Sequence, residues 1–128
     1  MNINSSSKKF LVIATLFMAS AIALGAFGAH GLKKVLEPEM LKVFHTGVEY
    51  QFYNTFGLFF ASIIYILKPN SKKVRLSLIL IIVGTLIFSI SLYALTILNM
   101  PILGAITPIG GTLQIIAYLL LCFGILKD

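Results

Sequence analysis

The most chemically distinctive residue is a glutamate inside an otherwise apolar stretch. Glu49 is the only acidic residue within the four long hydrophobic runs of this 128-residue chain, and His45 precedes it by four positions. A carboxyl group in such a setting can carry a proton along a membrane pathway. It can also simply accept hydrogen bonds that hold helices together. Both interpretations stay open, and we favour the structural one because Glu49 lies near an end of its run.

The remaining reactive residue types match no recognised site. His30 and His45 lack the ligand spacing of metal or haem centres. Cys122 stands alone in the last apolar run, where a thiol usually packs as a small apolar group. The chain shows no phosphate-binding loop and no nucleophile–base pair. We therefore expect no catalytic residue, no metal and no cofactor.

Polar side chains accompany Glu49 at one end of each run. If successive runs alternate in direction, all these ends lie in the same half of the protein. Unpaired polar groups that face lipid are costly, so we expect the side chains to face the interior, with Glu49 in reach of another helix. This candidate ligand-binding polar cluster comprises His30, Glu49, Tyr50, Gln51, Asn54, Ser89, Ser91, Tyr93, Thr107 and Gln114.

The runs that carry these residues are long enough to cross a membrane. They cover residues 10–29, 44–67, 76–98 and 108–126. A hydrocarbon core of ~30 Å is crossed by roughly 20 helical residues, and backbone groups inside it must bond within their own segment. The sequence thus predicts an all-α fold, a four-helix transmembrane bundle that forms a single domain over residues 1–128.

Composition supports a membrane protein. Apolar residues make up 59 % of the chain and charged residues only 11 %, whereas soluble domains have about 45–50 % and 25 %. The net charge of +6 does not indicate nucleic-acid binding, because the cations lie in short connections between runs. A cleaved signal peptide is an alternative for the first run, but the run exceeds the usual ~7–15 residues and three more follow.

The cations also predict an orientation. One set of connections and ends carries Lys8, Lys9, Lys68, Lys72, Lys73, Arg75 and Lys127; the opposite set carries Lys33, Lys34 and Lys42. Because Lys and Arg concentrate on the cytoplasmic side, we expect both termini in the cytoplasm. The second helix should begin at Pro38, which would make it ~45 Å long and place its first turns in the outer interface.

Small residues suggest where helices touch. Ala21, Gly25 and Ala29 recur at four-residue steps, which is a close-packing pattern in membrane helices. Gly110 and Gly111 are expected to do the same at the start of the fourth helix.

Four motifs occur together in a known family. They are Gly25-Ala26-Phe27-Gly28-Ala29-His30-Gly31, Thr46-Gly47-Val48-Glu49-Tyr50-Gln51, Phe88-Ser89-Ile90-Ser91-Leu92-Tyr93 and Leu103-Gly104-Ala105-Ile106-Thr107-Pro108-Ile109-Gly110-Gly111. In this respect the chain resembles the YgdD-like small membrane proteins (domain of unknown function 423), a group that includes transmembrane protein 256. The resemblance implies a multi-pass protein of the bacterial cytoplasmic (inner) membrane. Members usually have histidine at the position of Asn54 and glycine at that of Ile90. Because asparagine does not titrate, the first departure favours a structural polar network.

Two functions compete for this architecture. The first is a structural or small-ligand- or lipid-binding module built around the polar cluster, with lipid and a second copy or another membrane protein as partners. The alternative is a small proton-coupled transporter or channel-like oligomer that uses Glu49. Small multidrug exporters, which are also four-helix proteins, have their glutamate in the middle of the first helix and usually a tryptophan at the site. This chain has no acidic residue in its first run and no tryptophan, so we favour the module.

Overall fold

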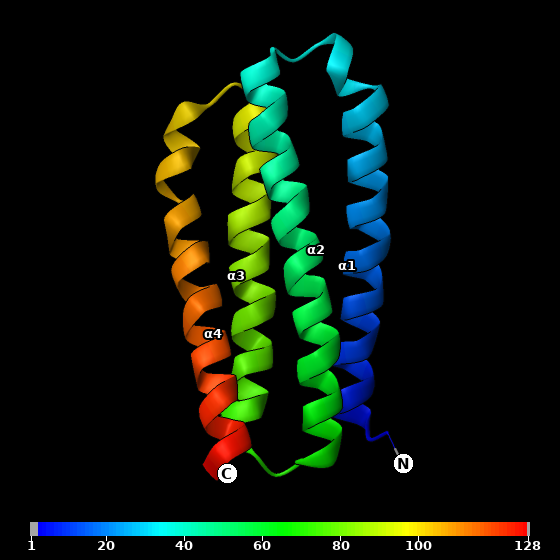
Figure 1. Cartoon of the computed structure of the whole chain (residues 1–128), viewed down its shortest axis with the longest axis vertical. Coiled ribbons are helices and arrows are strands. Elements are labelled where there is room, and N and C mark those ends of the chain that lie inside the picture. Colours follow the sequence, from blue (N-terminus) through cyan, green and yellow to red (C-terminus); the bar gives the residue numbers. More distant parts are fainter. Residues whose placement is uncertain (1–2, 128) are drawn as a thin grey trace.

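The computed structural model describes residues 3–127, and within that range it contains helices and no strands. The elements are α1 (Ser5–His30), the short 3-10 helix η1 (Leu32–Lys34), α2 (Pro38–Leu67), α3 (Lys72–Ile97), a second 3-10 helix η2 (Pro101–Ala105) and α4 (Thr107–Lys127). Consecutive long helices run antiparallel, so both chain ends lie at the end of the bundle that holds the α2–α3 turn (Figure 1). The predicted all-α, four-helix architecture is confirmed.

Local signals at the helix ends explain where the helices begin. The Asn4 side chain accepts a hydrogen bond from the Ser7 amide at 2.8 Å, and Ser71 does the same for Val74 at 3.1 Å. Both are N-caps that satisfy otherwise unpaired amides. α2 begins at Pro38, whose missing amide hydrogen is not needed in a first turn. Each helix begins before the apolar run predicted for it.

Three helical segments are long and apolar enough to span a membrane. They cover Ser5–Lys34, Lys72–Ile97 and Pro101–Lys127. α2 falls outside this set, because its first half carries polar residues such as Gln51 and Asn54. Both of these side chains are nevertheless buried, and α2 runs beside α1 and α3 along its length (Figure 1). Neighbouring helices thus shield these two polar side chains of α2.

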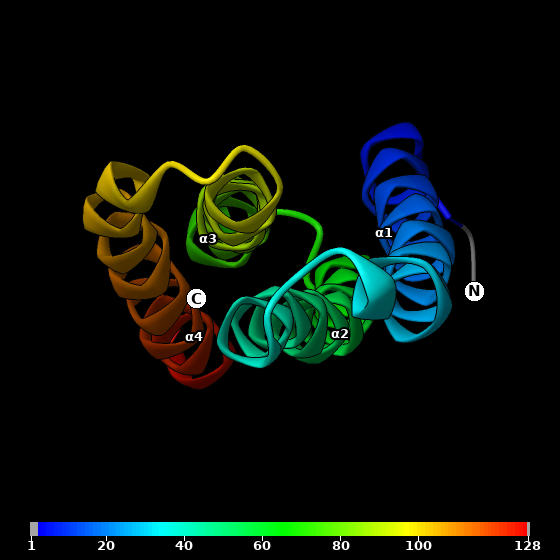
Figure 2. The same cartoon turned by 90° about the horizontal axis from the view of Figure 1, so that it is seen from above.

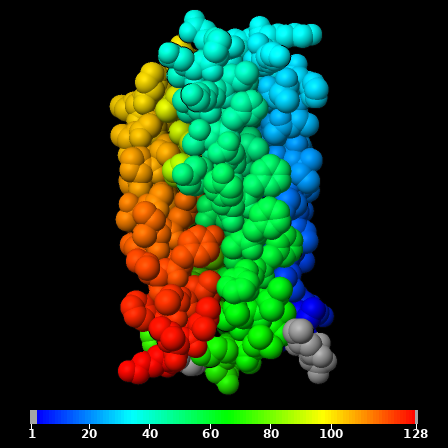
Figure 3. All heavy atoms as spheres, in the orientation of Figure 1, coloured from blue at the N-terminus to red at the C-terminus, as the bar shows by residue number. Residues whose placement is uncertain are grey.

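The four helices form a zigzag rather than a closed square (Figure 2). α4 packs chiefly on α3, α3 on α2 and α2 on α1, while α2 and α4 touch only at a few points. This order leaves one groove between α1 and α3, above α2, and another between α2 and α4. Figure 3 shows the other face of the bundle, where the outer side of α2 lies between α4 and α1. Large apolar side chains such as Phe56, Phe60 and Leu119 are exposed on the outside, as expected for a surface in contact with lipid.

Apolar packing is concentrated at the two ends of the bundle. Toward the chain termini, buried residues from all four helices form one core: Phe10, Ala14, Leu58, Ala61, Tyr65, Val74, Leu78, Ile81, Ala117 and Leu121. At the other end, Leu32, Phe44 and Val48 form a smaller one. Most buried side-chain hydrogen bonds between helices lie between these two cores.

The backbones of α3 and α4 are in close contact at Gly84 and Gly110. A Cβ atom placed on Gly110 would lie 2.5 Å from the Phe88 amide nitrogen and 2.8 Å from the Gly84 carbonyl oxygen. No side chain fits there, because the neighbouring atoms belong to the backbone of α3. On Gly111 the nearest atoms would be those of the Phe88 ring at 3.7 Å, an ordinary contact.

α1 packs with a different period from the one predicted. Ala21 is buried and Gly25 faces the Val48 side chain, but Ala29 is exposed. The buried small residues are instead Ala14, Ala21 and Gly28, at seven-residue steps. A seven-residue repeat keeps one face of a helix against a neighbour that crosses at about +20°, whereas four-residue steps suit the opposite crossing. The expected contact at Ala29 is therefore wrong.

Candidate functional site: a polar groove between α1 and α3

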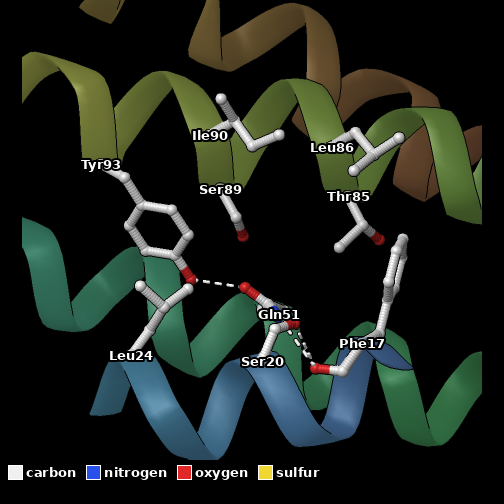
Figure 4. A pocket seen from close by; sticks show the side chains of 9 residues that line it. All are labelled: Phe17, Ser20, Leu24, Gln51, Thr85, Leu86, Ser89, Ile90 and Tyr93. Atoms are coloured by element: carbon white, nitrogen blue, oxygen red, sulfur yellow. Dashed lines mark hydrogen bonds between the residues drawn. The ribbon is translucent and has the colours of Figure 1, made fainter. Parts of the chain in front are cut away.

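The groove between α1 and α3 has a volume of about 200 Å³. α2 forms its floor, and Figure 4 shows the side chains of the three helices directed toward a common space. Leu86 and Ile90 are exposed on its α3 side, so the groove opens laterally. The lining residues are Phe17, Ser20, Leu24, Gln51, Thr85, Leu86, Ser89, Ile90 and Tyr93.

Gln51 is the centre of the floor and joins three helices. Its amide nitrogen Nε2 donates to the Phe17 carbonyl oxygen and to Ser20 Oγ of α1, both at 2.8 Å. Its oxygen Oε1 accepts a hydrogen bond from the Tyr93 hydroxyl of α3 at 2.6 Å. Only 6 % of Gln51 is exposed. A buried amide is tolerated in such a place because both its nitrogen and its oxygen have partners.

Two buried hydroxyl groups of α3 line the same groove. Ser89 Oγ donates to the Gly47 carbonyl oxygen of α2 at 2.7 Å, and Thr85 Oγ1 donates to the Ile81 carbonyl oxygen of its own helix at 2.6 Å. Ser89 therefore also connects helices. Gly47 allows this close approach, since a Cβ there would meet the Tyr93 ring at 2.7 Å.

The predicted polar cluster is in fact divided, and its second part ties α4 to α2 and α3. The Tyr118 hydroxyl donates to Asn54 Oδ1 at 2.8 Å, while Asn54 Nδ2 donates to the Tyr50 carbonyl oxygen. Gln114 Nε2 donates to the Gly84 carbonyl oxygen at 3.2 Å. Ser91 and Thr107 share a hydrogen bond of 2.6 Å between α3 and the start of α4.

This second part borders the groove between α2 and α4. That groove has a volume of about 310 Å³ and is lined by Tyr50, Tyr53, Asn54, Gly57, Gln114, Ile115 and Tyr118. Its floor carries fewer hydrogen bonds between helices than the floor of the α1–α3 groove. Tyr50 is partly exposed on its rim and packs against Phe88, with ring centroids 4.7 Å apart.

Glu49 and His30 do not join either part of the cluster. Both side chains are exposed, and among residues 3–127 neither has a side-chain hydrogen bond or an ion pair. The reason lies in the length of α2: its 30 residues measure ~45 Å, well over the ~30 Å of a hydrocarbon core. About 20 residues counted back from Leu67 reach Val48. By this count Glu49 falls at the edge of the hydrocarbon core. Its side chain is exposed, so the expected interior position is wrong.

The predicted cluster lacked the apolar residues that line the α1–α3 groove, and it also lacked the hydroxyl groups of Ser20, Thr85 and Tyr118. Ser20 and Thr85 lie inside long apolar runs and carry no motif, and Tyr118 lies in the middle of the fourth run. For Tyr118 a signal did exist, since a buried tyrosine hydroxyl usually needs a partner. For the other two, only the helix rotation found in the structure places them at the groove.

At the end of the bundle that holds the chain termini, Lys68 forms hydrogen bonds with α4. Lys68 Nζ donates to the Gly124 carbonyl oxygen at 2.6 Å and to that of Ile125 at 3.3 Å. These carbonyls belong to the last turn of α4, where no helical amide is available and the helix dipole is negative. Lys68 thus links the end of α2 to the end of α4.

The chemistry available in the α1–α3 groove is that of uncharged oxygen atoms. None of its nine lining residues carries a charge. In the described part of the chain, no three His, Cys, Asp or Glu side chains lie close enough to hold a metal ion. The arrangement can therefore hydrogen-bond a neutral group beside an apolar one.

Fold and groove together define a small four-helix integral membrane protein. Residues 24–111 match a family described as a protein of unknown function (DUF423). The UPF0382 membrane protein YwdK of Bacillus subtilis is 37 % identical over 120 residues, which cover 94 % of this chain and 98 % of the relative. A UPF0382 membrane protein of Haemophilus influenzae is 41 % identical over 120 residues, covering 94 % and 95 %.

The chain therefore belongs to the DUF423 family of membrane proteins, and the family predicted from its four motifs is confirmed. No solved structure matches it.

Proposed function

We propose that this chain is a binding protein of the bacterial cytoplasmic membrane that holds one lipid or lipid-like molecule in the α1–α3 groove and does not act as an enzyme. The observation that carries the proposal is an open, largely apolar groove with a few polar atoms of Gln51, Thr85 and Ser89 at its floor. A cluster that served packing alone would be closed by its own side chains.

The size of the groove supports an occupant. Protein interiors contain few voids larger than a water molecule. A volume of about 200 Å³ equals several waters at ~30 Å³ each. The oxygen atoms of the floor keep lone pairs beyond their present hydrogen bonds, so an occupant with a polar group can make a bond there that a bare acyl chain cannot.

The floor is also fixed before anything binds. Three hydrogen bonds hold the Gln51 amide, and one of them comes from the Tyr93 hydroxyl. A site whose polar groups are already oriented loses little side-chain entropy when a ligand arrives. The groove therefore has the geometry of a preformed small-molecule site, although it is smaller than most sites for drug-sized ligands.

Proton-coupled transport through Glu49 has weaker support. Glu49 does not line the groove and its side chain is exposed, so the geometry offers no direct coupling between a proton on Glu49 and an occupant of the groove. Bilayer lipids are the partners that the groove favours. A second copy of the chain or another membrane protein could cover the same opening, and the experiment below separates these cases.

The test compares two substitutions at exposed isoleucine and leucine positions of similar exposure. Ile90→Trp narrows the groove from its rim, whereas Leu119→Trp adds the same side chain on α4, away from the groove. Native mass spectrometry of protein released from nanodiscs of bacterial lipid counts molecules retained by the chain. We expect one retained molecule in the wild type and in Leu119→Trp, and a several-fold loss in Ile90→Trp.

Equal retention in all three proteins would refute the groove as the binding site. If the main species had the mass of a dimer, and Ile90→Trp abolished that dimer, a second copy of the chain and not a lipid would cover the groove.

A further inference from the structure

The hydrogen-bond donors of the α1–α3 groove are all in use. Both amide hydrogens of Gln51 point to α1, and the single hydroxyl hydrogen of Tyr93 points to Gln51. Ser20 donates to the Phe17 carbonyl oxygen at 3.1 Å. Ser89 and Thr85 each donate to a backbone carbonyl oxygen. No other lining residue has a polar side-chain hydrogen, so the groove offers no free side-chain donor.

Acceptor capacity, by contrast, remains. A hydroxyl oxygen has two lone pairs and a side-chain amide oxygen also has two. Gln51 Oε1 accepts only from Tyr93 among the described residues, and Ser20 Oγ only from Gln51. Figure 4 shows the Ser89 oxygen directed from α3 toward Gln51, and the Thr85 oxygen on the side of the Phe17 ring. The few polar atoms at the floor of this largely apolar groove are therefore acceptors without donors.

Such a lining discriminates among polar groups. A phosphate or carboxylate needs donors or cations and finds neither. An ammonium group would find acceptors but no counter-charge among the lining residues, and a charge removed from water without a partner is costly. A neutral hydroxyl donates one hydrogen bond and brings no charge. It is the polar group that fits best.

We propose, building on the proposed function, that the α1–α3 groove selects an uncharged lipid with a free hydroxyl group, a membrane alcohol. The hydroxyl donates to the acceptors around Ser89 and Gln51, and the apolar body lies along Leu24, Leu86 and Ile90. Charged phospholipids are excluded from the polar floor and occupy the bilayer around it.

A pair of probes that differ only in the donor tests this selectivity. Dodecan-1-ol and its methyl ether have nearly the same apolar length, and only the alcohol can donate. Each is titrated into protein in phosphatidylcholine nanodiscs, and bound probe is counted by native mass spectrometry. We expect the alcohol to bind about tenfold more tightly than the ether, which corresponds to about 1.4 kcal/mol.

Two serines of α3 provide the matched variants. Ser89→Ala removes one of the acceptors at the groove and should lower the alcohol-to-ether ratio several-fold. Ser91→Ala removes a hydroxyl that bonds Thr107 outside the groove, and it should keep the ratio of the wild type. Thr85→Val, which keeps nearly the same shape, is the second groove variant if Ser89→Ala does not fold.

The outcomes separate this inference from the function on which it rests. Equal binding of alcohol and ether, both lost in Ile90→Trp, would overturn the selectivity and leave the groove as a binding site. Stronger binding of dodecylamine than of the alcohol would also overturn it, since the groove would then accept a charge. If neither probe binds and Ile90→Trp changes nothing, the proposed function fails as well.

Discussion

A single methyl group at Gly110 should separate the two most tightly packed helices. In Gly110→Ala the new Cβ would lie 2.5 Å from the Phe88 amide nitrogen and 2.9 Å from the Phe88 Cα atom. Attractive contacts between heavy atoms begin near ~3.5 Å. Since the opposing atoms are backbone, no rotamer change relieves the overlap. α3 and α4 must move apart by roughly 1 Å.

The magnitude follows from the loss of contacts. A gap of ~0.5–1 Å forfeits about a quarter to a half of the dispersion energy between facing atoms. Overpacking of a tight site costs ~1–3 kcal/mol, and an immovable backbone places Gly110→Ala near ~3 kcal/mol. Alanine recovers only ~0.5–1 kcal/mol through its better helix propensity. We therefore expect a net destabilisation of ~2 kcal/mol or more.

The neighbouring glycine supplies the control. In Gly111→Ala the Cβ would meet the Phe88 ring at an ordinary 3.7 Å. This variant should be neutral or slightly stabilised, by at most ~1 kcal/mol. Unfolding in mixed micelles with increasing sodium dodecyl sulfate, followed by circular dichroism, gives both free energies. Coincident unfolding curves for the two variants would refute the close backbone approach.

Three further predictions concern the ends and the second groove. Glu49→Gln should leave the unfolding midpoint unchanged, because the exposed carboxylate has no partner in the described chain; a clear shift in the same titration would reveal one. Tyr118→Phe should destabilise the protein by ~1 kcal/mol, since it removes the hydrogen bond to Asn54, and wild-type stability would mean that water replaces the hydroxyl. In a cysteine-free background, a thiol at Lys34 should react with an impermeant maleimide added to intact cells, whereas one at the exposed Asn70 should not. The opposite labelling pattern would invert the orientation.

The helices were predictable because their signals are local. Apolar length alone located the four runs, and Pro38 marked the start of α2. Gly110 could be assigned to a helix contact because few residues permit backbones to touch. None of these inferences needs the relative rotation of two helices.

The buried faces were harder to predict, because they depend on that rotation. α3 is apolar on all sides, so its periodicity does not reveal that Thr85 and Ser89 line a groove. Ala29 was assigned to a contact from a four-residue step, but the crossing of α1 over α2 follows a seven-residue one. The polar neighbours of Glu49 predict an interior position, but the rotation of α2 leaves its side chain exposed.

Several bonds between helices end on a backbone carbonyl oxygen. Gln51 donates to that of Phe17, Ser89 to that of Gly47, Gln114 to that of Gly84 and Lys68 to that of Gly124. In each of these bonds the donor is a particular side chain, whereas the acceptor is a backbone carbonyl oxygen, which every amino acid has. A substitution at the acceptor position leaves the bond intact if the backbone keeps its path. A change at position 17 therefore requires no matching change at position 51 during evolution. Contacts of this kind would not be detected from co-variation among relatives.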